Sequence, residues 1–302
     1  RDIVDVSKNK PTAAAETRPR LLHAVTDVPG ALGAPARNAF RPSNIPAMMA
    51  VVASTGLLIA ADEQVLAETR RLASRVDLPQ NHPSANVRLG PFKQPFPTTV
   101  GSGLYFLGDG MASVFLAAGF AARGSLADDM RARRTASEVI EALLVSGTVT
   151  QTPKHVAGRQ TPSEATVPRG RWRPFPSLSA YSANVPAYDA FPSGHLASTM
   201  ATLTVVATNY HEHKFIWPVS IATMGVLSFT MVNNGVHWAS DYPLALAIGG
   251  VVGKTVASRG RKVVRMPPGP SGDGVRAADR SRLSFDFRPI VAPGVLGIRA
   301  TW

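Results

Sequence analysis

The sequence of 302 residues has no cysteine. Disulfides, thiolate metal sites and cysteine nucleophiles are therefore excluded, and the redox compartment stays open. Acidic residues are also scarce, since 20 Asp and Glu stand against 32 Lys and Arg, which gives a net charge of +12. Such a charge favours anionic partners: a phosphorylated small molecule, a phospholipid or an anionic membrane surface. Basic and aromatic residues are not interleaved and no known nucleic-acid motif occurs, so we expect no nucleic-acid partner.

The mean hydropathy is only +0.03, which is low for a bundle of lipid-facing helices. Six apolar segments nevertheless occur, mostly rich in Ala, Leu and Met, with lengths that suit helices better than strands. They are 45–61, 104–122, 137–147, 195–210, 215–232 and 242–258. The sequence therefore predicts a mainly α fold, a single helical-bundle domain of about six core helices joined by long loops.

The segment 215–232 has 18 consecutive uncharged residues, which raises the question of a membrane span. Asp109 interrupts the second apolar segment, and Glu138 and Glu141 lie in the third. These charges argue against a simple bundle of spans, so we favour a buried core helix for 215–232.

Composition divides the chain into three parts. Residues 1–20 are expected to be a flexible N-terminal arm, 21–258 the helical domain, and 259–302 a basic linker and tail with a short β-hairpin near Pro293. Within the domain, 77–103 is predicted to be an irregular loop or small cap. Residues 151–192 form a second long loop with many prolines and basic residues, and a loop of this length in a compact domain is usually functional.

The stretch FPSGHLASTM, residues 191–200, places Pro-Ser-Gly-His at the predicted start of a helix. The first amides of a helix have no internal partner and the dipole is positive there, so the start can seat a phosphate. Gly194 would let the anion approach the backbone and Ser193 would add a hydroxyl. The alternative is plain N-capping by Ser193, with His195 incidental.

A second stretch, NNGVHWASDYP, carries His237 and Asp241 four residues apart, just before the last predicted helix. A carboxylate there can accept a hydrogen bond from one imidazole nitrogen and leave the other free as a nucleophile. The alternative is that Asp241 caps the helix and His237 packs beside Trp238.

A third stretch, KHVAGRQTP, carries Lys154 and Arg159 in the long loop. Alone, it could be a solvated basic loop. Taken with the other two stretches, it completes a set for phosphoryl transfer: a nucleophile, an acid, and donors and cations for the phosphate oxygens. We expect no metal, because the sequence shows no carboxylate cluster to hold one.

The order and spacing of these stretches resemble the type-2 phosphatidic acid phosphatase and vanadium haloperoxidase superfamily, in a divergent bacterial form. The Pro-Ser-Gly-His block is intact at 192–195, and His237 and Asp241 have the family separation. Lys154, Gly158, Arg159 and Pro162 match a common bacterial form of the first block. The resemblance covers about 100–258, with the signature region at 150–258.

The resemblance implies a metal-independent phosphomonoesterase that acts on a phosphorylated small molecule or phospholipid. His237 would be the nucleophile that forms a phosphohistidine, oriented by Asp241, and His195 would be the general acid. The phosphate would be bound by Lys154, Arg159, Ser193 and Gly194. No cofactor is expected, vanadate would be an inhibitor, and the site would be extracytoplasmic (periplasmic) or membrane-associated.

Two family arginines are absent: Thr161 and Met231 stand at their places. Each arginine would make charge-assisted contacts worth about 1.5–3 kcal/mol. Two alternatives therefore stay open. One is a weak or inactive homologue that binds phosphate or a phospholipid headgroup. The other is a vanadate-dependent haloperoxidase with vanadate as prosthetic group. The substrate is not determined by the sequence.

Overall fold

The computed structural model describes residues 23–26, 28–30, 32–33, 41–89, 92–259, 286–292 and 295–301. The expected arm at 1–20 and the basic linker that follows the last helix lie outside these residues. The predicted domain boundaries at 21 and 258 therefore stay predictions.

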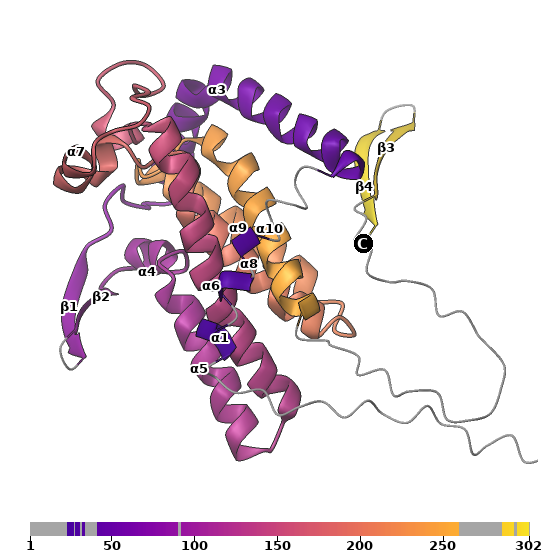
Figure 1. The fold of residues 1–302 in the computed structure, drawn as a ribbon. Helices are drawn as coiled ribbons and strands as arrows, with labels where there is room; N and C mark the ends of the chain where they lie inside the picture. The colour runs from indigo at the N-terminus through magenta and orange to yellow at the C-terminus, as the bar shows by residue number, and fades with distance from the viewer. Residues whose placement is uncertain are drawn as a thin grey trace, which may run out of the picture.

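The fold is mainly α, as predicted (Figure 1), and each of the six apolar segments overlaps one of its long helices. They are α3 (Ile45–Ser74), α5 (Met111–Leu126), α6 (Met130–Ala157), α8 (Gly194–Asn209), α9 (Ile216–Asn233) and α10 (Tyr242–Arg259). The second apolar segment is not one helix, because α4 (Val100–Phe106) meets α5 at a bend of 71°. Asp109 lies in this break, and Gly110 supplies the positive φ of 64° that the turn requires.

Short elements connect the long helices, and two antiparallel hairpins complete the structure. In the predicted cap, β1 (Ser84–Leu89) pairs with β2 (Phe92–Pro97). The C-terminal hairpin is also confirmed, with β3 (Asp286–Ala292) paired to β4 (Val295–Thr301). The short helices and turns are α1 (His23–Thr26), η2 (Pro42–Asn44), η3 (Pro162–Glu164), α7 (Leu178–Ala183), η4 (Val185–Ala187) and η5 (Ala239–Asp241).

The helix α8 lies at the centre of the core and packs against α6 and α10. A Cβ at Gly249 would collide with the carbonyl oxygen of Ala197, so glycine permits this close approach of α10 to α8. The buried cluster at this contact consists of small and β-branched side chains, among them Val205 and Val252. This tight packing fixes the N terminus of α8, where the Pro-Ser-Gly-His block lies.

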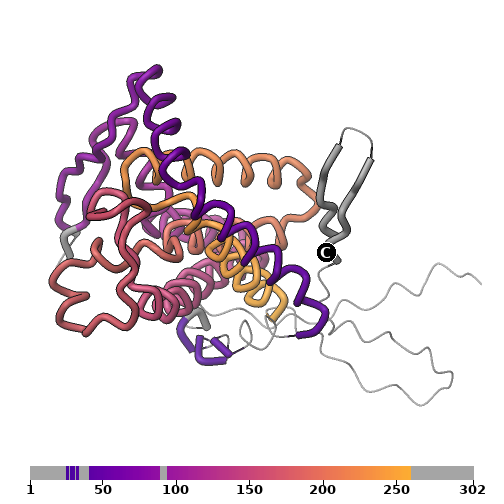
Figure 2. Tube along the Cα trace, turned by 90° about the horizontal axis from the view of Figure 1, so that it is seen from above, coloured from indigo at the N-terminus to yellow at the C-terminus, as the bar shows by residue number. Residues whose placement is uncertain are grey.

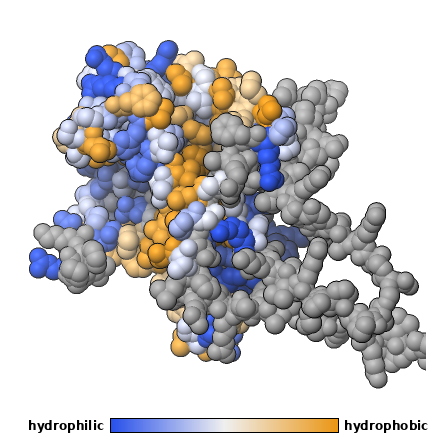
Figure 3. All heavy atoms as spheres, in the orientation of Figure 1, coloured by the Kyte–Doolittle hydropathy of each residue, from blue (hydrophilic) through white to orange (hydrophobic). Residues whose placement is uncertain are grey.

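Among the described residues, two helices are long and apolar enough to cross a membrane, Pro42–Ser74, which joins η2 to α3, and Ile216–Asn233, or three if the bent pair α4 and α5 is one span. Only 6% of the apolar window of the first is buried, and 39% of that of the second. We expected 215–232 to be a buried core helix, but α9 is only partly buried, and Val219 and Ile221 are exposed. Figure 2 shows α3 lying across α10, and Figure 3 shows hydrophobic atoms gathered in a band on one face. These helices are consistent with membrane association.

Candidate active site

The two histidines of the separate motifs converge. His195 is the second residue of α8, and His237 lies in the connection between α9 and η5. Nδ1 of His195 is 3.1 Å from Nε2 of His237. Nδ1 of His237 lies 2.8 Å from the carbonyl oxygen of Ala190, which can only accept. In a neutral ring His237 therefore carries its proton on Nδ1, and its Nε2 accepts from His195.

Burial favours the neutral form of both imidazoles. Only 1% of His237 is exposed, and burial, helped by the positive charge of Lys154, lowers its pKa to about 4. Burial and the neighbouring His237 hold the pKa of His195 well below the usual 6.5. At neutral pH, Nε2 of His237 is thus unprotonated, and the lone pair that a nucleophile requires is the one that here accepts from His195.

The geometry of Asp241 differs from our expectation that it would hydrogen-bond to His237. Its Oδ2 lies 3.6 Å from Nδ1 of His237, too far for a good hydrogen bond. Both oxygens are already engaged, because Oδ2 accepts from the Trp238 amide at 2.7 Å and Oδ1 from Arg159 at 2.7 Å. Asp241 therefore holds the backbone beside His237, and the carbonyl of Ala190 orients the ring. Burial raises the pKa of Asp241 to about 7, against the opposing charge of Arg159.

Arg159 lies behind His237, away from the expected phosphate. Its side chain is fully buried between the rings of Trp172 and Trp238. Its five N–H donors make five hydrogen bonds to protein acceptors: Asp62, Asp241, Ser240 and, twice, the carbonyl of Arg169. In this arrangement no donor of Arg159 is available to a phosphate, so its expected binding role finds no support in the geometry.

Lys154 is placed as a phosphate ligand would be. It lies in the last turn of α6, which Gly158 caps in the left-handed conformation. Its Nζ lies 3.6 Å from where a Cβ of Gly194 would be, so it meets the N terminus of α8. In the structure this ammonium binds Asp189, at 2.6 Å from Oδ2 and 2.9 Å from the main-chain oxygen.

Ser193 and Gly194 form the start of α8. The Ser193 hydroxyl accepts from the Leu196 amide at 3.3 Å, so Ser193 is the N-cap. This capping does not use the amides of Gly194 and His195, which are the first two of the helix. The structure thus brings together His195, His237, Lys154 and this helix start. Asp241 and Arg159 lie behind the histidine pair.

Residues 135–264 match the model of the PAP2 superfamily. This range contains the three sequence blocks and every site residue considered so far. Residues 135–264 belong to the PAP2 superfamily. Membership supports a hydrolase of the phosphatase type at the level of the superfamily. No curated protein and no solved structure matches the chain.

The positions of the two missing PAP2 arginines are buried in this chain. Met231 is fully buried and packs with Leu196 and Leu227 in the core. The hydroxyl of Thr161 is 3.0 Å from that of Ser163, and Thr161 is 3% exposed. An arginine at 231 would place a charge in an apolar cluster. The methionine thus belongs to a repacked core beside the site.

Two functional candidates were missed in the sequence. Asp62 lies in α3, outside the PAP2 match, and is fully buried against Arg159 and Ser240, each at about 2.6–2.7 Å. Its signal was an acidic residue directly after the apolar run 45–61. Asp189 lies two residues before the cis Phe191–Pro192 bond, and its signal was a carboxylate next to the Pro-Ser-Gly-His block.

Among the described residues, no group of three or more His, Asp or Glu is placed to hold a metal ion.

Proposed function

We propose that the protein is a membrane-associated, metal-independent phosphomonoesterase that acts through a phosphohistidine at His237. The observation that carries this proposal is the meeting of His195 and His237, 42 residues apart in the chain, beside Lys154 and the start of α8. PAP2 membership supports the reaction class. The intermediate, the absence of a cofactor and the substrate class are parts of the proposal.

The proposed reaction has two steps. Nε2 of His237 attacks phosphorus and forms an N–P bond, while the P–O bond to the alcohol breaks and His195 gives a proton to the leaving oxygen. Water then attacks phosphorus with His195 as the base, which releases phosphate and regenerates His237. Lys154 and the first amides of α8 hold the non-bridging oxygens.

The hydrogen bond between the two histidines must open for this reaction. At 3.1 Å the two nitrogens leave no room for a phosphorus atom between them. We infer that the entering phosphate replaces this bond and accepts from His195. Its negative charge also favours the protonated form of His195, opposing the effect of burial.

The proposed site lies just after the end of the apolar helix α9 and beside the point where the apolar stretch of α3 gives way to charged residues. His237 follows the last residue of α9 by four positions, and Asp62 follows the apolar stretch of α3 directly. A site at such a boundary would face a membrane surface, where both phospholipids and soluble phosphate esters are accessible. The extracytoplasmic side is carried over from the resemblance and is part of the proposal.

The test is hydrolysis of p-nitrophenyl phosphate in the presence of a metal chelator. We expect His237→Ala to lose about a thousandfold or more in kcat, since nucleophilic catalysis is removed. His211→Ala, at an exposed histidine, is the matched control and should keep the parent rate. A parent rate in His237→Ala would overturn the proposal.

A second candidate is a homologue that binds phosphate or a phospholipid headgroup without turnover. Its support is that Lys154 is held by Asp189 and that Arg159 has no donor available to substrate. Binding of vanadate or phosphate to a purified protein that hydrolyses no ester would favour this function.

A further inference from the structure

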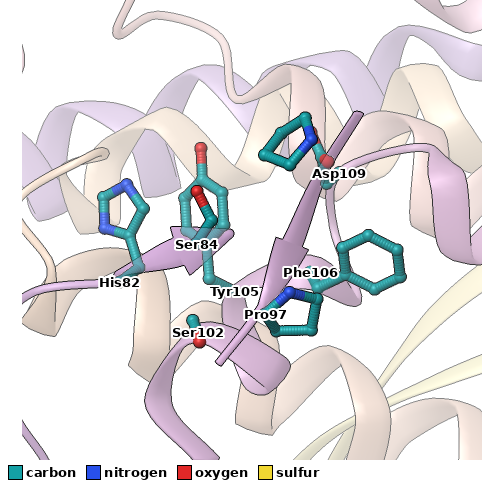
Figure 4. Close-up of a pocket in the computed structure, with 8 residues that line it drawn as sticks. His82, Ser84, Pro97, Ser102, Tyr105, Phe106 and Asp109 are labelled. Carbon is teal, nitrogen blue, oxygen red and sulfur yellow. The ribbon is translucent and has the colours of Figure 1, made fainter. Parts of the chain in front are cut away.

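A cavity of about 220 Å³ lies between the β1–β2 hairpin and α4. Its walls include His82, Ser84, Pro97, Tyr105, Phe106 and Asp109. Figure 4 shows Tyr105 between His82 and Asp109 in this view. All of these residues lie outside the PAP2 match, so the cavity belongs to a part of the chain that the family does not describe.

The cavity borders the proposed general acid. The ring of Tyr105 stacks on His82 at 4.1 Å between centroids, and it also lies beside the ring of His195, at 5.3 Å. Tyr105 is therefore a wall shared by the cavity and the histidine pair. Because the general acid protonates the leaving oxygen, the alcohol of a bound ester lies on the His195 side, toward this cavity.

The charge of its lining residues makes the cavity suited to a cation. Asp109 is a lining residue, and both Asp109 and Asp189 act electrostatically on the Tyr105 hydroxyl. None of the eight described residues that line the cavity is lysine or arginine. The face of Tyr105 is covered by His82, so the lining group that would pair with an ammonium group is the carboxylate of Asp109.

The charges around the proposed phosphate-binding site give a second, independent reason to expect a cation on the leaving alcohol. Lys154 is paired with Asp189, and the burial of both histidines favours their neutral forms. A phosphate that takes Lys154 leaves Asp189, 24% exposed, without its cation beside a new dianion. An ammonium group on the alcohol would restore this balance, which a neutral alcohol cannot do.

We propose that this cavity is the leaving-group subsite and that it selects phosphate monoesters of short alcohols that carry an ammonium group. The inference rests on the proposed function for the direction of the leaving group. The volume of about 220 Å³, room for about seven waters, accommodates a short amino alcohol with its hydration.

The experiment compares 2-aminoethyl phosphate with propyl phosphate, which has the same shape and no charge on the alcohol. We expect kcat/KM to be about tenfold higher for the amino ester, the gain of one partly desolvated cation contact. In Asp109→Asn, kcat/KM for the amino ester divided by kcat/KM for propyl phosphate should fall by about threefold or more. Asp128→Asn, at the other end of α5 and exposed, is the matched control and should keep the parent ratio.

A ratio of one or below in the parent protein overturns the inference, and so does a ratio unchanged by Asp109→Asn. If neither these esters nor p-nitrophenyl phosphate is hydrolysed, the proposed function fails separately. In that case, the Kd values of 2-aminoethyl phosphate and propyl phosphate, measured by titration calorimetry on the parent protein, test the proposed subsite. Tighter binding of the amino ester supports the subsite, and equal or weaker binding rejects it.

Discussion

The two cations of the KHVAGRQTP stretch, Lys154 and Arg159, are held in different ways. Arg159 is fully buried, and five hydrogen bonds fix it to Asp62, Asp241, Ser240 and a carbonyl. Lys154 meets one carboxylate whose side chain is 24% exposed, and it faces the start of α8. A residue of the sequence motif can therefore have a structural role and not a substrate-binding one. Arg159 stabilises the fold, whereas Lys154 can exchange Asp189 for the substrate phosphate.

Removing Arg159 should have the largest effect on stability. Arg159→Met leaves the carboxylates of Asp62 and Asp241 buried without their shared cation, so the free energy of unfolding should fall by about 3–5 kcal/mol. Denaturant unfolding measures this change. Arg71→Met, at an exposed ion pair, is the control and should be nearly neutral. If the free energy of unfolding falls no further in Arg159→Met than in the control, the structural role of Arg159 is contradicted.

Removing Lys154 should instead act on catalysis. Lys154→Met loses a charge-assisted contact to phosphate, so kcat/KM for p-nitrophenyl phosphate should fall about 10- to 100-fold. The loss of unfolding free energy should be smaller than in Arg159→Met, because Asp189 can be hydrated. Lys214→Met, at an exposed position, serves as the control. An unchanged kcat/KM in Lys154→Met would contradict the assignment of this lysine.

The pH profile reports on the two histidines. His237 must be neutral to attack, and its pKa of about 4 makes it so above that pH. His195 must be protonated to act as an acid, and its pKa lies well below 6.5. We therefore expect kcat/KM to be highest at acidic pH and to fall toward neutrality, where His195 has lost its proton. An optimum above pH 7 would show that the roles or the electrostatics are assigned wrongly.

The smallest expected effect concerns the partner that Lys154 exchanges. Asp189→Asn removes the carboxylate that competes with phosphate, so inorganic phosphate and vanadate should inhibit about 3- to 10-fold more tightly. Inhibition constants for p-nitrophenyl phosphate hydrolysis measure this. Weaker inhibition in Asp189→Asn would mean that the carboxylate positions Lys154 for phosphate.

The fold and the centre of the site could be predicted because they depend on local patterns. Apolar runs of helical length marked the six long helices, and the Pro-Ser-Gly-His block marked the start of α8. The break between α4 and α5 was missed as a bend, although Asp109 and Gly110 mark it. The partial alternation of residues on both sides of the Pro293-Gly294 dipeptide was enough to indicate the C-terminal hairpin.

The surroundings of the histidines could not be predicted, because their partners come from distant elements. Asp62 reaches Arg159 across 97 positions of the chain, and no local pattern predicts which way a loop arginine turns. The same holds for the carbonyl of Ala190, which takes the hydrogen bond of His237 that we expected Asp241 to accept. Tertiary packing alone decides these contacts.

The most direct test of the central claim is to trap the intermediate. The parent protein is mixed with a phosphate ester labelled on phosphorus, quenched in alkali and analysed by mass spectrometry of its peptides. If His237 is the nucleophile, an alkali-stable, acid-labile phosphoryl group is found on the peptide that contains His237, and none is found in His237→Ala. A phosphoryl group on another residue, or turnover that transfers the phosphoryl group directly to water, would contradict this assignment.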